Sequence, residues 1–116
     1  MKFALLIYAD ETKVAAMTRD EIAERYGAFT AYVLALREAG AFVSSQGLQS
    51  TEHASTVHLR DGKPVVQDGP FAESKDQVGG VFVIEAADMD AALEWAARHS
   101  ALPIGAVEVR PVWITN

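Results

Sequence analysis

The chain contains no cysteine, and this absence removes several kinds of chemistry at once. Disulfide bonds, thiolate nucleophiles and zinc sites with cysteine ligands are excluded, and a cysteine-free chain suits a reducing compartment. Basic residues are also scarce, because 10 Lys and Arg stand against 16 Asp and Glu, for a formal net charge of −6. Since binding to a phosphate backbone normally needs a face rich in Lys and Arg, we do not expect nucleic acid as a partner.

Long hydrophobic runs are missing as well. The apolar run from Phe3 to Tyr8 is shorter than the core of a signal peptide, and no run approaches the length of a membrane span. We therefore expect a cytoplasmic protein with no membrane partner. Because the chain has 116 residues and no linker rich in Pro, Gly or Ser, we expect one domain over residues 1–116.

The sequence does contain alternating strand and helix patterns. The run from Phe3 to Tyr8 is typical of a strand covered on both faces. The capping-box sequence from Thr18 to Glu21 predicts a helix over about residues 19–39. The apolar stripe on its inward face is expected to comprise Ile22, Tyr26, Phe29, Val33 and Leu36.

The rest of the chain completes a recognisable order of elements. The sequence predicts strands over 41–48, 80–85 and 105–115, and a β-hairpin with its turn at Asp61-Gly62. A second helix is predicted from Asp88 to about His99. Its inward residues are expected to be Met89, Leu93 and Ala96 or Ala97. This order is βαββαβ with an inserted β-hairpin, a ferredoxin-like α+β arrangement with both helices on one face of an antiparallel sheet. Because the first and third main strands are apolar on both sides, we expect a second protomer to cover the other face.

Several segments of the chain resemble the DGPF branch of the YCII-related family. The resemblance implies a dimeric α+β barrel, in which two ferredoxin-like protomers place their sheet faces together around a cleft. It covers nearly the whole chain and rests on LLIYADE (5–11), DGK (61–63), DGPFAESKDQVGG (68–80) with the downstream VFVIEAADMDAALEWAAR, and VEVRPV (107–112).

The same resemblance implies a candidate catalytic residue and bears on two possible functions. In the YCII branch, a His on the first helix and an Asp just before the Pro-containing turn are a proposed catalytic pair. Asp68 matches the Asp, whereas Phe29 stands near the expected His, so the pair is not intact here. From the expected dimer cleft we predict a homodimer that binds a small polar molecule, with cofactor-independent acid/base chemistry as an extension. The alternative is a noncatalytic regulatory module associated with an extracytoplasmic-function sigma factor.

The loop that begins at Asp68 supplies the first candidate residues. Gly69 and Pro70 define a tight turn, where the Asp68 carboxylate would act as a general base or orient a ligand. The alternative is a turn in which Asp68 bonds its own loop backbone. Glu73 and Lys75 are candidate ligand-binding residues in the same loop, with a solvated surface pair as the alternative.

Two further candidates lie on predicted strands that face the dimer cleft. Arg110 shares a strand face with Glu108, and it would hold an anion or pair with an acid, for which Asp10, Glu11 and Asp68 are the candidates. Tyr8 would offer its hydroxyl to the same cleft, or pack as an aromatic ring with a solvated tip.

No metal or cofactor is expected from the sequence. His53 and His58 are spaced so that one strand would place them on opposite faces, and His99 lies near a helix end, where the dipole favours a cation. The chain has no glycine-rich phosphate loop, nucleophile elbow or dinucleotide fingerprint.

Overall fold

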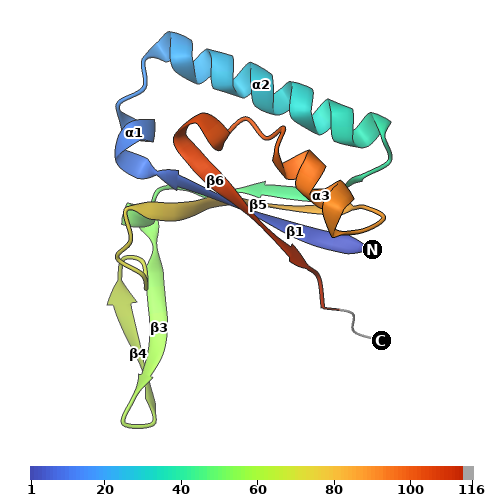
Figure 1. Cartoon of the computed structure of the whole chain (residues 1–116). Coiled ribbons are helices and arrows are strands. Elements are labelled where there is room, and N and C mark those ends of the chain that lie inside the picture. The colour runs from blue at the N-terminus through green and yellow to red at the C-terminus, as the bar shows by residue number, and fades with distance from the viewer. Residues whose placement is uncertain (114–116) are drawn as a thin grey trace.

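A four-stranded antiparallel sheet lies at the centre of the computed structural model, which describes residues 1–113 (Figure 1). Helices α2 and α3 cover one face of this sheet, and the predicted ferredoxin-like fold is confirmed. The strands lie side by side in the order β2 (Phe42–Gly47), β5 (Asp76–Glu85), β1 (Lys2–Asp10) and β6 (Gly105–Pro111).

The remaining elements connect these strands or cover the sheet. The helices are α1 (Glu11–Ala15), α2 (Arg19–Glu38) and α3 (Met89–Ala96), with 3-10 turns at η1 (Thr51–His53) and η2 (Leu102–Ile104). Strands β3 (Ser55–Arg60) and β4 (Lys63–Asp68) form a separate two-stranded sheet.

The alternation of side chains along β1 divides the sheet into two faces. Phe3, Leu5 and Ile7 are buried under the helices, whereas Leu6 and Tyr8 lie half-buried on the opposite face. Cross-strand partners share a face, so Val81 and Val83 of β5 lie beside Leu6 and Ala4 on that helix-free face. The sheet is therefore apolar on both sides, as the sequence predicts.

Helix α2 begins at the predicted capping box but does not lie flat on the sheet. The Thr18 hydroxyl accepts from the Glu21 amide, and the Glu21 carboxylate accepts from the Thr18 amide, both at 3.1 Å. In the C-terminal half, Tyr32 and Leu36 are buried, with exposed fractions of 5% and 0%. In the N-terminal half, Ile22 and Tyr26 are 54% and 72% exposed, so the expected inward stripe is wrong there. Figure 1 shows the cause, because α2 slopes away from the sheet towards its N-terminus.

Two other helical details differ from the sequence prediction. Helix α3 ends at Ala96, before His99, and its buried side is formed by Ala92 and Ala96, while Leu93 is exposed. The small alanine side chains let the helix approach the sheet closely. The short helix α1 was not expected; Asp10 caps it by accepting from the Thr12 amide at 2.9 Å.

The inserted hairpin leaves the main sheet and projects to the side opposite the helices (Figure 1). Both residues of its turn have positive φ, 52° at Asp61 and 76° at Gly62, which confirms the predicted type I′ turn. At its base, the Glu11 carboxylate accepts from the Thr51 amide at 2.9 Å and from the Thr51 hydroxyl at 2.7 Å. Helix α1 therefore fixes the start of the hairpin.

The boundaries of the last two main strands also differ from the prediction. Strand β5 begins at Asp76 rather than Gly80, so it includes the end of the DGPF loop. Strand β6 ends at Pro111, so Trp113, which lies within the predicted strand 105–115, follows the strand and is exposed. The predicted strand residues Ile114 and Thr115 lie outside the described residues.

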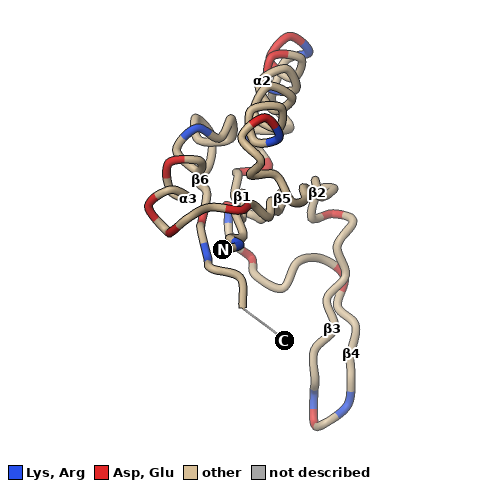
Figure 2. The backbone as a smooth tube through the Cα atoms, turned by 90° about the vertical axis from the view of Figure 1, so that its right-hand side faces the viewer, with Lys and Arg blue, Asp and Glu red and all other residues tan. Residues whose placement is uncertain are grey.

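Figure 2 shows Lys and Arg spread over the helices, the sheet and the hairpin tip rather than gathered on one face. Within residues 1–113, no helix is both long and apolar enough to cross a bilayer.

We expect two glycine substitutions to change stability in opposite directions. Gly27 lies in the middle of α2, and a Cβ there meets nothing within 4 Å. Gly27→Ala should therefore raise the free energy of unfolding by about 0.5–1 kcal/mol, because alanine loses less backbone entropy in a helix. The matched variant Gly40→Ala has equal space but a φ of +70°, and it should lower the free energy by about 1–2 kcal/mol. Urea denaturation measures both, and a loss of stability in Gly27→Ala would contradict this description of α2.

Candidate functional site

The turn at Asp68 is fixed by backbone groups rather than by the Asp68 side chain. Gly69 has a φ of +100°, its amide donates to the Ala54 carbonyl at 2.8 Å, and its carbonyl accepts from the Thr56 hydroxyl at 2.8 Å. Asp68 is exposed at the end of β4, and its carboxylate makes no hydrogen bond to any residue in the range 1–113. The expected bond from Asp68 to its own loop backbone is therefore not made.

Lys75 ties the rest of this loop to the end of β1. Its ammonium lies 3.5 Å from Oδ2 of Asp10, whose carboxylate is buried. Hydrogen bonds from the Thr12 hydroxyl and amide lower the pKa of Asp10, and the Lys75 charge contributes in the same direction against the effect of burial. Lys75 thus pairs with Asp10 instead of Glu73, which is exposed.

Arg110 and Tyr8 share the helix-free face of the main sheet. The Arg110 guanidinium donates to the Glu108 carboxylate at 2.6 Å, so its acid partner is its neighbour on the strand, and the expected partners Asp10, Glu11 and Asp68 are wrong. The predicted site residues fall into three separate places: Tyr8 and Arg110 on the sheet face, Asp68 at the hairpin base, and Glu73 and Lys75 in the loop.

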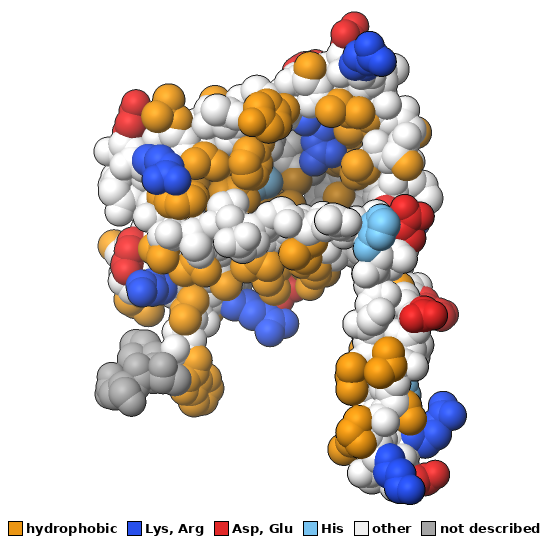
Figure 3. All heavy atoms as spheres, turned by 180° about the vertical axis from the view of Figure 1, so that it is seen from behind, with side chains coloured by type: hydrophobic (Ala, Val, Ile, Leu, Met, Phe, Trp, Pro, Cys, Tyr) orange, Lys and Arg blue, Asp and Glu red, His pale blue; other side chains and the backbone are white. Residues whose placement is uncertain are grey.

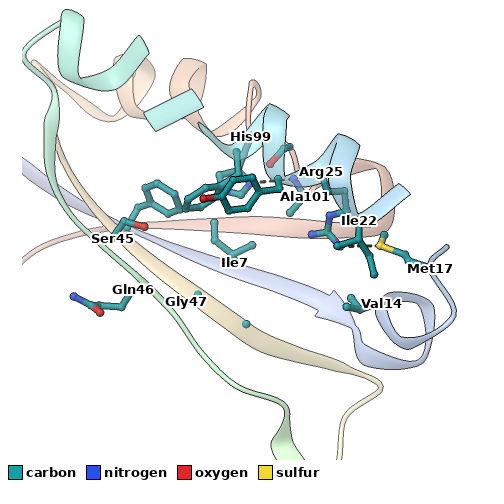
Figure 4. A pocket seen from close by; sticks show the side chains of 16 residues that line it. Ile7, Val14, Met17, Ile22, Arg25, Ser45, Gln46, Gly47, His99 and Ala101 are labelled. Carbon is teal, nitrogen blue, oxygen red and sulfur yellow. Dashed lines mark hydrogen bonds between the residues drawn. The ribbon is translucent and has the colours of Figure 1, made fainter. Parts of the chain in front are cut away.

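The structure contains a cavity that the sequence reasoning missed, which we call cavity 1. It lies between the N-terminal half of α2 and the sheet and has a volume of about 350 Å3 (Figure 4). Its walls are mainly apolar and aromatic, and they include Ile7, Ile22, Tyr26, Phe29 and Phe82. None of the five predicted site residues lines it.

Glycines supply part of the space in cavity 1. Gly47 of β2 pairs with Gly80 of β5, and both line the cavity together with Gly79. A Cβ at Gly47 or Gly79 meets nothing within 4 Å, whereas a Cβ at Gly80 comes within 3.2 Å of the Gln46 carbonyl oxygen. Gly47 shares a sheet face with its partner Gly80, so a larger side chain at Gly47 has room to occupy part of the cavity.

A second cavity, cavity 2, adjoins the first at the base of the hairpin. Its volume is about 580 Å3, and its polar lining includes Glu11, Thr12, Ser50 and Glu52. Arg25 lines both cavities, as do three small or apolar residues, Ile7, Val14 and Gly79. Arg25 therefore lies where the apolar cavity meets the polar one.

His99 lines cavity 1 as a neutral, buried imidazole. Only 6% of it is exposed, and its ring packs against Tyr32 and Phe82, with ring centroids 4.8 Å and 5.1 Å away. Burial lowers the pKa of His99 to about 4, and the positive charge of Arg25 makes a smaller contribution to this shift. The expected stabilisation of a cation at a helix end is wrong here, because α3 ends at Ala96 and desolvation dominates.

The hydrogen bond at Nδ1 of His99 defines its tautomer. Nδ1 accepts from the Ala101 amide at 3.0 Å, so the ring proton of the neutral imidazole lies on Nε2. Within residues 1–113, this Nε2 has no hydrogen-bond partner.

Arg25 is the one charged residue among those that line cavity 1. Its guanidinium contacts the Met17 sulfur at 3.5 Å and makes no ion pair with a carboxylate of residues 1–113. Figure 4 shows it beside Ile22. The sequence did carry a signal, because Arg25 falls three residues after Ile22, inside the apolar stripe of α2.

In the described part of the chain, no group of three His, Asp or Glu side chains is placed to hold a metal ion.

The fold and the cavity define a ferredoxin-like α+β protein with a cavity beneath its first long helix. The chain belongs to the YCII-related domain family, which it matches over residues 1–116. It is 36% identical over 114 residues to an uncharacterised protein of Rhizobium meliloti (strain 1021), covering 97% of this chain and 92% of that one.

Among solved structures, the chain is similar in fold to 5-chloro-2-hydroxyhydroquinone dehydrochlorinase from Burkholderia phenoliruptrix AC1100, in complex with 2,5-dihydroxybenzoquinone. The TM-score is 0.58 at 15% sequence identity, over 100% of this chain and 96% of that one.

We expect His99 to make stability depend on pH. Its pKa of about 4 in the folded state lies below the usual 6.5, so between these values the unfolded chain binds more protons. The free energy of unfolding should therefore fall by about 3 kcal/mol as the pH drops from 6.5 to 4. In His99→Gln this part of the pH dependence should be absent, as urea denaturation across the pH range would show. An imidazole NMR titration of His99 with a midpoint near 6.5 would contradict the assignment.

Proposed function

We propose that this protein binds a small polar molecule in cavity 1 and acts as a homodimer. The observation that carries the proposal is cavity 1 itself. Ligand sites in proteins are typically apolar hollows of about 300–1,000 Å3 with a few convergent polar groups. Cavity 1, at about 350 Å3, has that size and composition, with Arg25, His99 and Ser45 as polar groups among aromatic walls.

The exposed apolar residues around cavity 1 support the same proposal. Ile22, Tyr26 and Phe29 lie on the side of α2 that borders the cavity, and all three are exposed. Figure 3 shows a hollow between helix and sheet that is rimmed by hydrophobic side chains. Contiguous exposed apolar surface is unfavourable in water and usually marks a binding site. A ligand in cavity 1 would cover part of it.

The family relationship is consistent with this location. Phe29, which stands near the position of the proposed catalytic His in the YCII branch, lines cavity 1 and contacts Phe82 edge to face at 5.7 Å. The dehydrochlorinase of similar fold was solved with a small ring compound. An acid/base role for Asp68 and a sigma-factor partner stay separate, sequence-based predictions.

The homodimer is supported by a concave apolar surface on the helix-free side. Leu6, Val81 and Val83 lie on the sheet face, and the hairpin presents Val57 and Leu59, which are 65% and 69% exposed. Figure 3 shows hydrophobic side chains under the sheet and on the side of the hairpin that faces this space. The Cα radius of gyration is 16.1 Å, against about 13 Å for a compact chain of about 100 residues. A second copy between sheet and hairpin would bury both surfaces.

A thermal-shift screen of small aromatic and polar compounds tests the ligand site. Compounds that raise the melting temperature of the wild type should lose this effect in Gly47→Leu, because the new side chain occupies cavity 1. The control Gly27→Leu adds the same side chain on α2 outside the cavity and should keep every shift. Asp68→Ala should also keep them. Shifts that persist in Gly47→Leu but vanish in Asp68→Ala would place the site in the DGPF loop and contradict the proposal.

Analytical ultracentrifugation tests the homodimer. The wild type should sediment at twice the chain mass at micromolar concentration, and Leu59→Glu should shift the population to monomer. Leu59 is exposed in a single protomer, so a folding defect is not expected. Leu34→Glu, at an exposed leucine of α2, is the matched control and should remain dimeric. A monomeric wild type would refute this part of the proposal.

A further inference from the structure

We infer that the ligand of cavity 1 is a flat organic anion whose negative end lies on the guanidinium of Arg25. This inference rests on the proposed function, because it names the class of molecule that the same cavity would take. It is carried by the charge, the unused hydrogen-bonding capacity and the shape of the cavity lining.

The charge of cavity 1 is opposite in sign to that of the chain. The protein has a formal net charge of −6, yet no Asp or Glu lines cavity 1, and its one charged lining residue is Arg25. His99 is neutral near pH 7, so it adds no second positive charge. A single cation in a mainly apolar hollow favours a ligand with a single negative charge.

Arg25 also has hydrogen-bonding capacity that the described residues do not use. A guanidinium has five N–H donors, and the contact of Arg25 within residues 1–113 is with the Met17 sulfur, a weak acceptor. The acid one helical turn before Arg25, Glu21, is engaged with Thr18 in the capping box. In the adjoining cavity 2, Glu11 is held by Thr51. A carboxylate or enolate would bind the free edge of the guanidinium through two parallel hydrogen bonds.

The shape of cavity 1 favours a flat body for this anion. The rings of Tyr26, Phe29 and Phe82 line it, and the volume of about 350 Å3 is at the small end of the usual range. Aromatic rings stack on planar molecules or meet them edge to face. The hydroxyls of Ser45 and Tyr26 add neutral hydrogen-bonding groups without a second charge.

The alternative is that Arg25 binds no ligand: its aliphatic carbons pack against apolar neighbours, and its guanidinium is solvated by water. The two descriptions differ in one measurable property, the preference for a charged over a neutral compound of the same shape. Benzoate and benzamide form such a pair, because they share a planar ring and differ in charge at neutral pH.

The test is isothermal titration of the full chain with benzoate and with benzamide at pH 7 and low salt. Benzoate should bind the wild type at least tenfold more tightly than benzamide. Arg25→Met should reduce this affinity ratio to within about twofold, because methionine keeps an unbranched apolar side chain and removes the charge. Arg25→Lys should give an intermediate ratio, because lysine keeps the charge but lacks the planar guanidinium that forms two parallel hydrogen bonds. Arg37→Met, on the same helix but stacked on Phe42 outside the cavity, should behave as the wild type.

Two results would overturn the inference. Equal affinities for benzamide and benzoate in the wild type, with both lost in Gly47→Leu, would leave the proposed cavity site standing and remove its preference for anions. A preference for benzoate that survives Arg25→Met would place the anion elsewhere. If neither compound binds the wild type at millimolar concentration, the inferred preference for a flat anion is wrong. The proposed ligand site itself would be refuted only if the thermal-shift screen also found no compound that binds in cavity 1.

Discussion

The packing of Tyr32 against Phe82 and Trp95 holds α2 against the sheet and α3. The Tyr32 ring meets Phe82 edge to face at 5.7 Å, and its hydroxyl donates to the Trp95 carbonyl at 2.7 Å. Burial raises the pKa of Tyr32 to about 12, so the hydroxyl remains a donor at any physiological pH. This contact joins α2, the sheet and α3, and it fixes the C-terminal half of α2 close to β5.

Because only one half of α2 is fixed in this way, the other half diverges from the sheet and opens cavity 1. The capping box at Thr18 stabilises the helical conformation of the N-terminal half, whereas burial of Ile22 and Tyr26 does not contribute because both are exposed. The glycines of β2 and β5 deepen the space below it, and Arg25 supplies a charge at its junction with cavity 2. His99 belongs to both features, since its ring packs on Tyr32 and also lines the cavity.

Local signals in the sequence predicted much of the fold, whereas the site depends on distant contacts. The capping box at Thr18 and the turn at Asp61-Gly62 act within a few residues, so their outcome could be predicted. The slope of α2 depends on a contact between Tyr32 and Trp95, which are 63 residues apart in the sequence. Helical periodicity predicts which residues share a helix face, but it does not predict contacts between residues so far apart. For the same reason, the buried state of His99 was missed. The partner of Arg110 was predictable in principle, because Glu108 lies two residues away on the same strand face.

NMR chemical-shift mapping distinguishes a ligand site beneath α2 from a ligand site at the DGPF loop. Titration of the isotope-labelled protein with benzoate is predicted to shift the backbone amides of Ser45, Gly47 and Gly79, together with the side-chain signals of Arg25. These groups come from three separate elements and are brought together only around cavity 1. Shifts confined to the segment from Asp68 to Lys75, with the Arg25 and Gly47 signals unchanged, would show that benzoate binds at the DGPF loop and not in cavity 1.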